Sequence, residues 1–440
     1  MKKNFYTSFI FSKLIECATK YNFNLFLVGG KVRDILIKEL TSHKDIDLYF
    51  HNFSSFSIIN YVLENCENFD LDFDFTLVNE NFYDALYFSE KFKDFLKSNM
   101  PRHEFFIKKN QSFLTVNISI KFNNFSISFD IATFRKEIYD YYGALPKVKY
   151  SQNILDDTLR RDITINSIYL KLTKDVGIID ELNGINDLKA KIIRLNYKFS
   201  LLDDPTRIFR IIKLKSRLKF EFSSATFSEL ILAKNKKIYK KISNYRIFSE
   251  IKKLFSENNE TIKNFLKDFV KLDFIKILAS NFSKKNYKNF CLDLKNFENL
   301  KNETLFLYFS KNFEKLINLV ENKKLKNLKK INLEENLWFL KFLIFLKNLE
   351  SFELKNILRR QTFPFNKFET KTILNLIFLL KAKKNKSFTK NIFNIENKNF
   401  HKKDNIDFLL ILIVFYKNNI MKEKILKLFQ IKKIDKFLKN

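Results

Sequence analysis

Two aspartates separated by one residue, Asp45 and Asp47, follow a Gly-Gly turn at the distance of one short helix. Alternate residues of a strand point to the same face, so these two carboxylates can hold one or two Mg²⁺ ions. The turn, Gly29-Gly30, lets backbone N–H groups approach a triphosphate with no Cβ in the way, and Arg33 adds a fixed positive fork. An isolated Asp-x-Asp is more often a pair of solvated acids. Together with the turn and Arg33, the pair predicts metal-assisted nucleotidyl transfer.

Charge and length narrow the class of protein. The chain has 440 residues, too many for one ordinary core, and its five Gly and four Pro predict helices over much of its length. Its 80 Lys and Arg residues outnumber 49 Asp and Glu residues, which gives a formal net charge of +31. A field of this size favours a polyanion, and nucleic acid is the first candidate. An A/T-rich coding bias, which would enrich Lys, Asn, Ile and Phe, is the competing explanation.

Cysteine usage and hydropathy indicate the compartment. The three cysteines are Cys17, Cys66 and Cys291. They are too few and too scattered for a disulfide framework or a zinc site, which predicts a reducing, cytoplasmic setting. The N-terminus imitates a signal peptide until Lys13 and Glu16 interrupt its apolar run. The longest apolar stretch, 408–416, is far shorter than the roughly 20 residues that span a bilayer, so we expect no membrane partner. The sequence implies no protein partner.

The elements that must position Asp45 and Asp47 can be read from periodicity. Helical spacing predicts helices over 5–21 and 31–40, and apolar or alternating runs predict strands over 24–28, 45–50, 113–122 and 125–133. The interval 54–110 is long for a simple connection, and we expect two helices in it. From residue 203 onward helical periodicity dominates, interrupted by turns rich in Asn and Lys.

Three further segments occur in a fixed order after the Gly-Gly turn and the Asp-x-Asp. They are 157–168 with Arg160-Arg161-Asp162, 180–194 with Asn183-Gly184, and 203–220 with Asp203-Asp204-Pro205-Thr206-Arg207. In this order the motifs resemble the bacterial-type tRNA nucleotidyltransferase and poly(A) polymerase family, within the DNA polymerase β-like superfamily. The resemblance implies an α+β protein: a nucleotidyltransferase head with a mixed sheet and flanking helices (1–200), an all-α neck (201–265), and a helical body and tail that bind tRNA (266–440).

The resemblance also implies roles for individual residues. Asp45 and Asp47 would be the catalytic, metal-binding carboxylates, and Asp130 matches a further acidic position of the family. A structural pairing of Asp130 with Arg135 or Arg161 is the alternative interpretation. The nucleotide-binding positions are Gly29, Gly30, Arg33, Arg161, Asp162, Asn166, Asp204, Arg207, Arg210 and Lys213. Lys213 stands where the family usually has Arg, and Asn183-Gly184 replaces a Gly-Gly.

Asp204 and Arg207 resemble the family's protein template, in which side chains select the incoming base. Cytosine and adenine both present an amino donor beside a ring-nitrogen acceptor, so Asp204 can accept from the amino group while Arg207 donates to the ring nitrogen. Guanine and uracil present the opposite order and leave both side chains unpaired. The alternative is structural: Asp204 before Pro205 is also a good helix N-cap with Pro at the first helical position.

The resemblance therefore predicts a Mg²⁺-dependent enzyme that adds CCA, or part of it, to tRNA 3′ ends from CTP and ATP. A poly(A) polymerase shares all five motifs and is the nearest alternative. A CC-adding or an A-adding tRNA enzyme is a second alternative, because the loop near 136–152 is divergent. A non-catalytic RNA-binding protein on the same scaffold is the alternative from another class.

Overall fold

The computed structural model describes residues 2–40, 61–62, 72–100, 103–122, 125–277 and 285–292. The expected strand at 45–50, with Asp45 and Asp47, lies outside these residues. The chain divides into two compact units, Met1–Ile242 and Ser243–Asn440. The division into head, neck and body at residues 200 and 265 stays a prediction.

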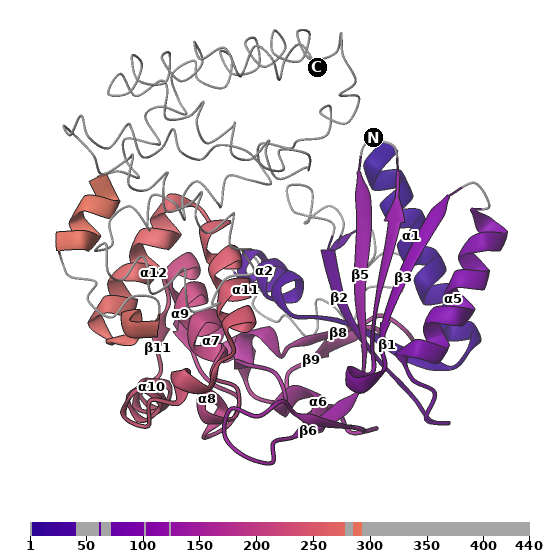
Figure 1. Cartoon of the computed structure of the whole chain (residues 1–440). Helices are drawn as coiled ribbons and strands as arrows, with labels where there is room; N and C mark the ends of the chain where they lie inside the picture. The colour runs from indigo at the N-terminus through magenta and orange to yellow at the C-terminus, as the bar shows by residue number, and fades with distance from the viewer. Residues whose placement is uncertain are drawn as a thin grey trace, which may run out of the picture. The chain divides into compact units, whose positions relative to one another are not determined.

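A mixed sheet of seven strands occupies the centre of the described part of the first unit (Figure 1). Its order is β3-β4-β5-β2-β1-β8-β9, with β2 and β5 parallel and the other neighbours antiparallel. The strands are β1 (Phe23–Val28), β2 (Asp72–Asn79), β3 (Glu104–Asn110), β4 (Thr115–Lys121), β5 (Ser126–Thr133), β8 (Tyr169–Lys171) and β9 (Gly177–Ile179). The mixed sheet with flanking helices confirms the predicted α+β fold class.

Helices α1 (Lys2–Lys20) and α5 (Ala85–Asn99) cover one face of this sheet (Figure 1). Phe11 of α1 lies with its ring centroid 4.6 Å from that of Phe73 and 5.5 Å from that of Phe75, both on β2. Phe88 of α5 packs against Phe23 of β1 at 5.1 Å. These aromatic contacts put the apolar positions of alternating strands into one core.

The other face of the sheet is polar where β2, β4 and β5 meet. On β5, Phe129 is fully buried toward the helices, whereas Ser128 and Asp130 point the other way and are partly or fully exposed. Successive strand residues alternate between faces, so one apolar-polar pattern builds both the core and a solvent-facing polar strip.

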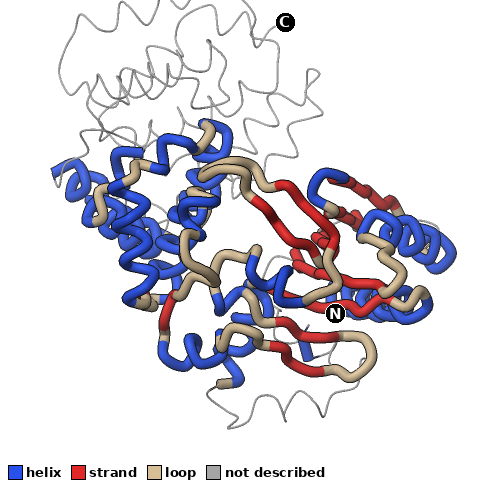
Figure 2. Tube along the Cα trace, turned by 90° about the horizontal axis from the view of Figure 1, so that it is seen from below, coloured by secondary structure: helices blue, strands red, loops and turns tan. Residues whose placement is uncertain are grey.

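The remaining described elements are helices, 3₁₀ helices and short strands, and Figure 2 shows the structure from below. In the first unit they are α2 (Gly30–Glu39), η1 (Gln111–Phe113), β6 (Arg135–Ile138), β7 (Lys147–Tyr150), α6 (Ile154–Leu159), η2 (Thr164–Asn166), α7 (Gly184–Ala190), β10 (Ile192–Ile193), α8 (Ser200–Asp203), α9 (Arg207–Leu218), β11 (Glu221–Phe222), α10 (Ser224–Asn235) and η3 (Ile238–Lys241). In the second unit they are α11 (Asn244–Phe255), α12 (Asn259–Lys271) and η4 (Phe274–Ile277). None of the described helices is both long and apolar enough to cross a membrane.

Periodicity predicted most of these elements correctly. Helices α1 and α2 and strands β1, β4 and β5 are confirmed, with ends shifted by at most three residues. Of the two helices expected in 54–110, α5 is described between strands β2 and β3, and residues 61–62 are also helical; the rest of 54–71 lies outside the described residues, so the second helix stays a prediction. The alternation of Asp, Phe, Asp and Phe at the start of β2 has a period of two, and its Phe residues are buried in the sheet core.

Gly184 allows α7 to pack on η2. A Cβ at Gly184 would lie 2.5 Å from the backbone oxygen of Thr164, closer than any van der Waals contact permits. Asn183 before it has φ 57° and ψ 36°, the left-handed region that Asn tolerates better than most residues. Asp180 accepts hydrogen bonds from the Gly184 and Ile185 N–H groups at 2.7 and 2.8 Å, which caps the helix.

We expect Gly184→Ala to destabilise the chain, because the added Cβ meets backbone that cannot move aside without shifting η2. Overpacking of this kind costs about 1–3 kcal/mol, which lowers Tm by roughly 2–10 °C for a unit of this size. Thermal unfolding followed by circular dichroism measures the change. Asn183→Gly is the matched control and should leave Tm unchanged or raise it; a Gly184→Ala variant as stable as the wild type would contradict the packing argument.

Candidate functional site

The Gly-Gly turn joins β1 to α2, and its geometry requires glycine. Gly29 has φ +84°, and a Cβ there would lie 3.2 Å from Oδ2 of Asp74 on β2. A Cβ on Gly30 would lie 3.4 Å from Nη2 of Arg33, closer than most such contacts. The turn therefore brings bare backbone to the polar face of the sheet, beside a carboxylate.

Asp74 is the acidic residue that the sequence analysis missed. It lies directly opposite Asp130 in the parallel register of β2 and β5, and both are exposed. Asn117 on β4 pairs with Asp130 on the other side, and its Nδ2 donates to Asp130 Oδ1 at 2.8 Å. Asp72-Phe73-Asp74 is a second Asp-x-Asp, and its alternation with Phe was the signal that could have found it.

The donor set at this point of the sheet fits a hard cation. Carboxylate oxygens are the protein ligands that Mg²⁺ prefers, and it commonly takes one or two of them together with substrate phosphates. Asp74 and Asp130 supply such oxygens on adjacent strands, next to the Gly29 backbone. Within the described residues no group of three or more His, Cys, Asp or Glu side chains is arranged to hold a metal by itself.

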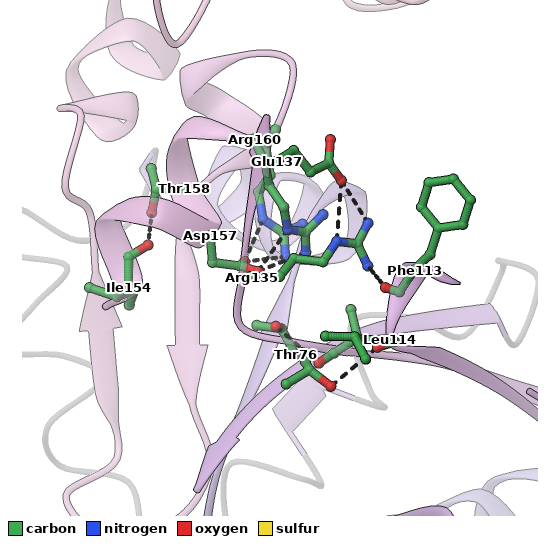
Figure 3. A network of polar contacts seen from close by, with 12 residues as sticks. Thr76, Phe113, Leu114, Arg135, Glu137, Ile154, Asp157, Thr158 and Arg160 are labelled. Carbon is green, nitrogen blue, oxygen red and sulfur yellow. Dashed lines mark hydrogen bonds and ion pairs between the residues drawn. The ribbon is translucent and has the colours of Figure 1, made fainter. Parts of the chain in front are cut away.

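The alternative interpretation of Asp130, a structural ion pair, is wrong. Arg135 instead donates to Glu137 Oε1 at 2.9 Å and to the Phe113 carbonyl at 2.5 Å (Figure 3). Arg161 donates to Asp157 Oδ2 at 2.9 Å. The Asp130 carboxylate therefore remains on the exposed polar face, held by Asn117 alone among the contacts described for it.

Arg33 and Asn166 come together although 133 positions separate them. The Arg33 guanidinium is 2% exposed and donates to Asn166 Oδ1 at 2.7 Å. Its Nε and Nη2 donate to Oδ1 of the adjacent Asp34 at 2.8 and 2.6 Å. Burial lowers the pKa of Arg33, and the Asp34 carboxylate opposes that shift. These bonds fasten η2 to the helix that follows the Gly-Gly turn.

A fully buried carboxylate, Asp157 of α6, organises the Arg-Arg-Asp segment (Figure 3). Its oxygens accept from Arg160 Nε at 2.8 Å, from Arg161 Nη2 at 2.9 Å and from the Tyr169 hydroxyl at 2.9 Å. Burial alone would raise the pKa of the Asp157 carboxyl, but the two guanidinium groups outweigh burial and hold that pKa below its usual range. Asp157 and Tyr169 therefore orient Arg161.

Arg207 at the start of α9 is also buried, with 1% exposure. Its Nη1 donates to Ser200 Oγ, and its Nη2 donates to the Arg160 carbonyl at 2.7 Å. Its Nε has no hydrogen-bond partner among the described residues and lies 3.9 Å from Oδ2 of Asp204. A buried donor without a partner thus stands beside a carboxylate oxygen, which is the pair that a base with an acceptor and an amino donor would satisfy.

The two carboxylate oxygens of Asp204 have different partners. Oδ1 accepts from the Thr206 N–H at 3.1 Å and from the Thr206 hydroxyl at 2.6 Å, in the turn that leads into α9. Oδ2 faces Arg210, whose Nη2 is 3.1 Å away, as well as Arg207. The Oδ1 contacts hold the turn before α9, although Thr206 is the N-cap of that helix and Pro205 lies outside it, while Oδ2 is engaged with Arg210.

Arg210 joins the α9 segment to Asp162. Its Nε lies 3.5 Å from Asp162 Oδ2, and its side chain is 37% exposed. Asp162 Oδ1 also accepts from the Ile163 N–H at 3.0 Å. Lys213, one turn further along α9, is partly exposed. The described site residues therefore form one connected region, in which Arg33 reaches Asn166, and Asp162 and Arg160 reach α9.

Comparison with known proteins shows which proteins this chain resembles. Residues 70–194 match the family model described as the poly A polymerase head domain. The A-adding tRNA nucleotidyltransferase of Halalkalibacterium halodurans is 31% identical over 255 residues, which cover 57% of this chain and 49% of that protein. The CCA-adding enzyme of Lactobacillus helveticus is 36% identical over 130 residues, 29% of this chain and 32% of that enzyme. The chain thus spans about half or less of the curated relatives it matches.

The fold agrees with these matches. A solved structure of a CCA-adding enzyme in apo form II superposes with a TM-score of 0.56 at 22% identity, over 96% of this chain and 83% of that chain. Residues 70–194 are thus similar to the poly A polymerase head domain, and the resemblance of the sequence motifs to the tRNA nucleotidyltransferase and poly(A) polymerase family is confirmed.

Proposed function

We propose that this chain is a Mg²⁺-dependent nucleotidyltransferase that adds C and A to tRNA 3′ ends from CTP and ATP. The observation that carries the proposal is the meeting of Asp74, Asp130 and the Gly29 turn on the polar face of the head sheet. The similarity to an A-adding tRNA nucleotidyltransferase supports tRNA as the substrate, and the similarity to a CCA-adding enzyme supports C and A as the added nucleotides. We also propose a reducing, cytoplasmic setting, with which the buried free thiol of Cys17 agrees.

In this proposal the carboxylates of the sheet bind the metal ion, and the Gly29 turn positions the triphosphate. Asp74 and Asp130 would hold Mg²⁺, which when bound neutralises the triphosphate and polarises the phosphoryl group under attack. The bare backbone at Gly29 lets N–H groups approach the triphosphate. Phosphoryl transfer needs such neutralisation and alignment of the 3′-hydroxyl more than it needs covalent catalysis.

Two Asp-x-Asp pairs are candidates for the metal ligands. The motif order points to Asp45 and Asp47, whereas Asp74 of the second pair adjoins Gly29 and Asp130. The residues that match the head-domain model begin at 70 and so include only the second pair. Both sets stay candidates: the motif order supports Asp45 and Asp47, and the position beside Gly29 supports Asp74 with Asp130.

Single Asp→Asn variants at the four positions should separate the two pairs. We expect Asp74→Asn and Asp130→Asn to lower nucleotide addition by at least about 100-fold, since loss of an outer-shell partner alone costs 10–100-fold. The same two variants should weaken binding of Mn²⁺, followed by electron paramagnetic resonance. Asp94→Asn, an exposed aspartate of α5, is the matched control. Losses confined to Asp45→Asn and Asp47→Asn would assign the metal to the first pair, and four active variants would refute the proposal.

Base choice would rest on Asp204 and Arg207. Both are buried, so a base with the wrong pattern leaves polar groups unpaired at a cost of about 1–3 kcal/mol each. Ser200 and the Arg160 carbonyl hold the Arg207 guanidinium, which keeps its Nε donor in one place. A fixed donor and acceptor can distinguish C and A from G and U without a nucleic-acid template.

The variants Asp204→Asn and Asp204→Ala distinguish a capping role of Asp204 from a role in selecting the incoming base. Asn keeps an oxygen for the Thr206 N–H but can present an amide donor in place of Oδ2, so we expect relaxed rejection of UTP and GTP and a loss of Tm limited to the ion pair with Arg210. Ala loses both oxygens and should also cost about 1 kcal/mol of stability. Measuring the incorporation of each nucleotide together with Tm shows which of the two roles Asp204 has. Unchanged selectivity in both variants would leave Asp204 as a cap only.

The reaction itself is tested with RNA ends of defined sequence. The purified chain is incubated with tRNA transcripts ending before CC, after CC and at CCA, and with unrelated RNA, supplying each nucleotide singly. Addition of C, C and A only to tRNA supports the proposal. Long A tails on any RNA would indicate a poly(A) polymerase, addition of only C or only A would indicate a partial enzyme, and binding without addition would indicate an RNA-binding protein.

A further inference from the structure

The β6–β7 hairpin carries an exposed aromatic tip that the proposed chemistry does not use. In the turn between the strands Tyr141 is 67% exposed, Tyr142 is 39% exposed and Leu145 is 67% exposed. Large apolar side chains gathered at one turn cost solvation and are typical of a contact surface. Tyrosine has a flat face that stacks on nucleobases whatever their sequence.

The strands below the tip present lysines with an unfavourable arrangement. Lys136 and Lys149 lie directly opposite each other in the β6–β7 register, and both are exposed. Like charges at such positions destabilise a hairpin, so the pair costs stability unless an anion lies against it. Asp156 lies 3.8 Å from the Lys136 ammonium, and Lys147 on the same face pairs with Asp140 at 2.8 Å, which offsets only part of this charge.

The 3₁₀ helix η3 contacts the tip of the hairpin and adds further lysines beside it. Lys241 at the end of η3 donates to the Tyr142 carbonyl at 3.0 Å, and its ammonium lies 5.6 Å from the centroid of the Tyr141 ring. A Cβ at Gly143, which has φ +80°, would lie 2.9 Å from Cβ of Lys241, so glycine permits this contact. Lys236, Lys237 and Lys240 beside it are exposed. The hairpin and η3 thus form one surface that alternates aromatic and cationic groups.

We propose that this surface binds single-stranded RNA, with phosphates on Lys136 and Lys149 and bases stacked on Tyr141 and Tyr142. Charge complementarity selects a polyanion, and the exposed tyrosines select one with exposed bases. The inference deepens the proposed function, since an RNA primer is the strand which that function extends. The test measures RNA binding without nucleotide and with EDTA, so its result does not depend on whether the chain adds nucleotides.

The experiment uses the full chain and a fluorescent 12-nucleotide single-stranded RNA, with affinity followed by anisotropy from low to moderate salt. We expect the Tyr141→Ala/Tyr142→Ala double variant to bind at least about 5-fold more weakly for each base it no longer stacks. We expect Lys136→Gln/Lys149→Gln to reduce the slope of log affinity against log salt by about 0.7 for each lost phosphate contact. Because all four side chains are exposed, we expect the Tm of both variants to stay close to that of the wild type.

The control variants carry the same types of substitution, Tyr→Ala and Lys→Gln, at exposed residues outside the β6–β7 hairpin. Tyr245→Ala removes a tyrosine that is 76% exposed, and Lys108→Gln/Lys121→Gln removes two exposed charges from the β3–β4 hairpin. Both controls should bind like the wild type. The proposal is overturned if the tyrosine variant binds within twofold of the wild type, or if the controls lose as much as the hairpin variants. Loss of binding to anionic phospholipid vesicles but not to RNA would assign the surface to a membrane instead.

Discussion

The buried carboxylate of Asp157 is the interaction on which the arrangement of the site depends. It has no solvent exposure, and two guanidinium groups and a tyrosine hydroxyl surround it. Taking one partner from such a group leaves a buried charge uncompensated, at a cost of about 3–5 kcal/mol. The chain therefore holds Arg160 and Arg161 in one geometry, and the Arg160 carbonyl in turn fixes Arg207.

This chain of contacts explains how distant segments form one site. Arg33, next to the Gly-Gly turn, reaches Asn166, and Arg210 of α9 lies between Asp162 and Asp204. Donors held in advance need no reorganisation when a ligand arrives, which is why fixed dipoles are more effective than mobile ones. The stability of the head and the proposed selection of bases thus depend on the same hydrogen bonds.

The sheet combines two environments through strand alternation. Phe73 and Phe129 are buried against α1, whereas Asp74 and Asp130 on the same strands are exposed on the opposite face. The aromatic core keeps β2 and β5 in parallel register, and that register sets the two carboxylates opposite each other. A slip of one residue would bury the acids and expose the rings, so the core protects the geometry of the polar face.

Sequence alone determined the local features of this protein. Periodicity identified α1, α2, β1, β4 and β5, and the Gly-Gly turn could be recognised because only glycine suits a positive φ beside a close neighbour. The order of the motifs identified the family, because it depends on residue types and not on distances. Only the tertiary structure brought Asp74 to Gly29 and Asp130, since this juxtaposition follows from strand pairing across more than 40 residues. It also decided that Asp157 orients Arg161, because burial and partner choice depend on contacts that spacing along the chain does not encode.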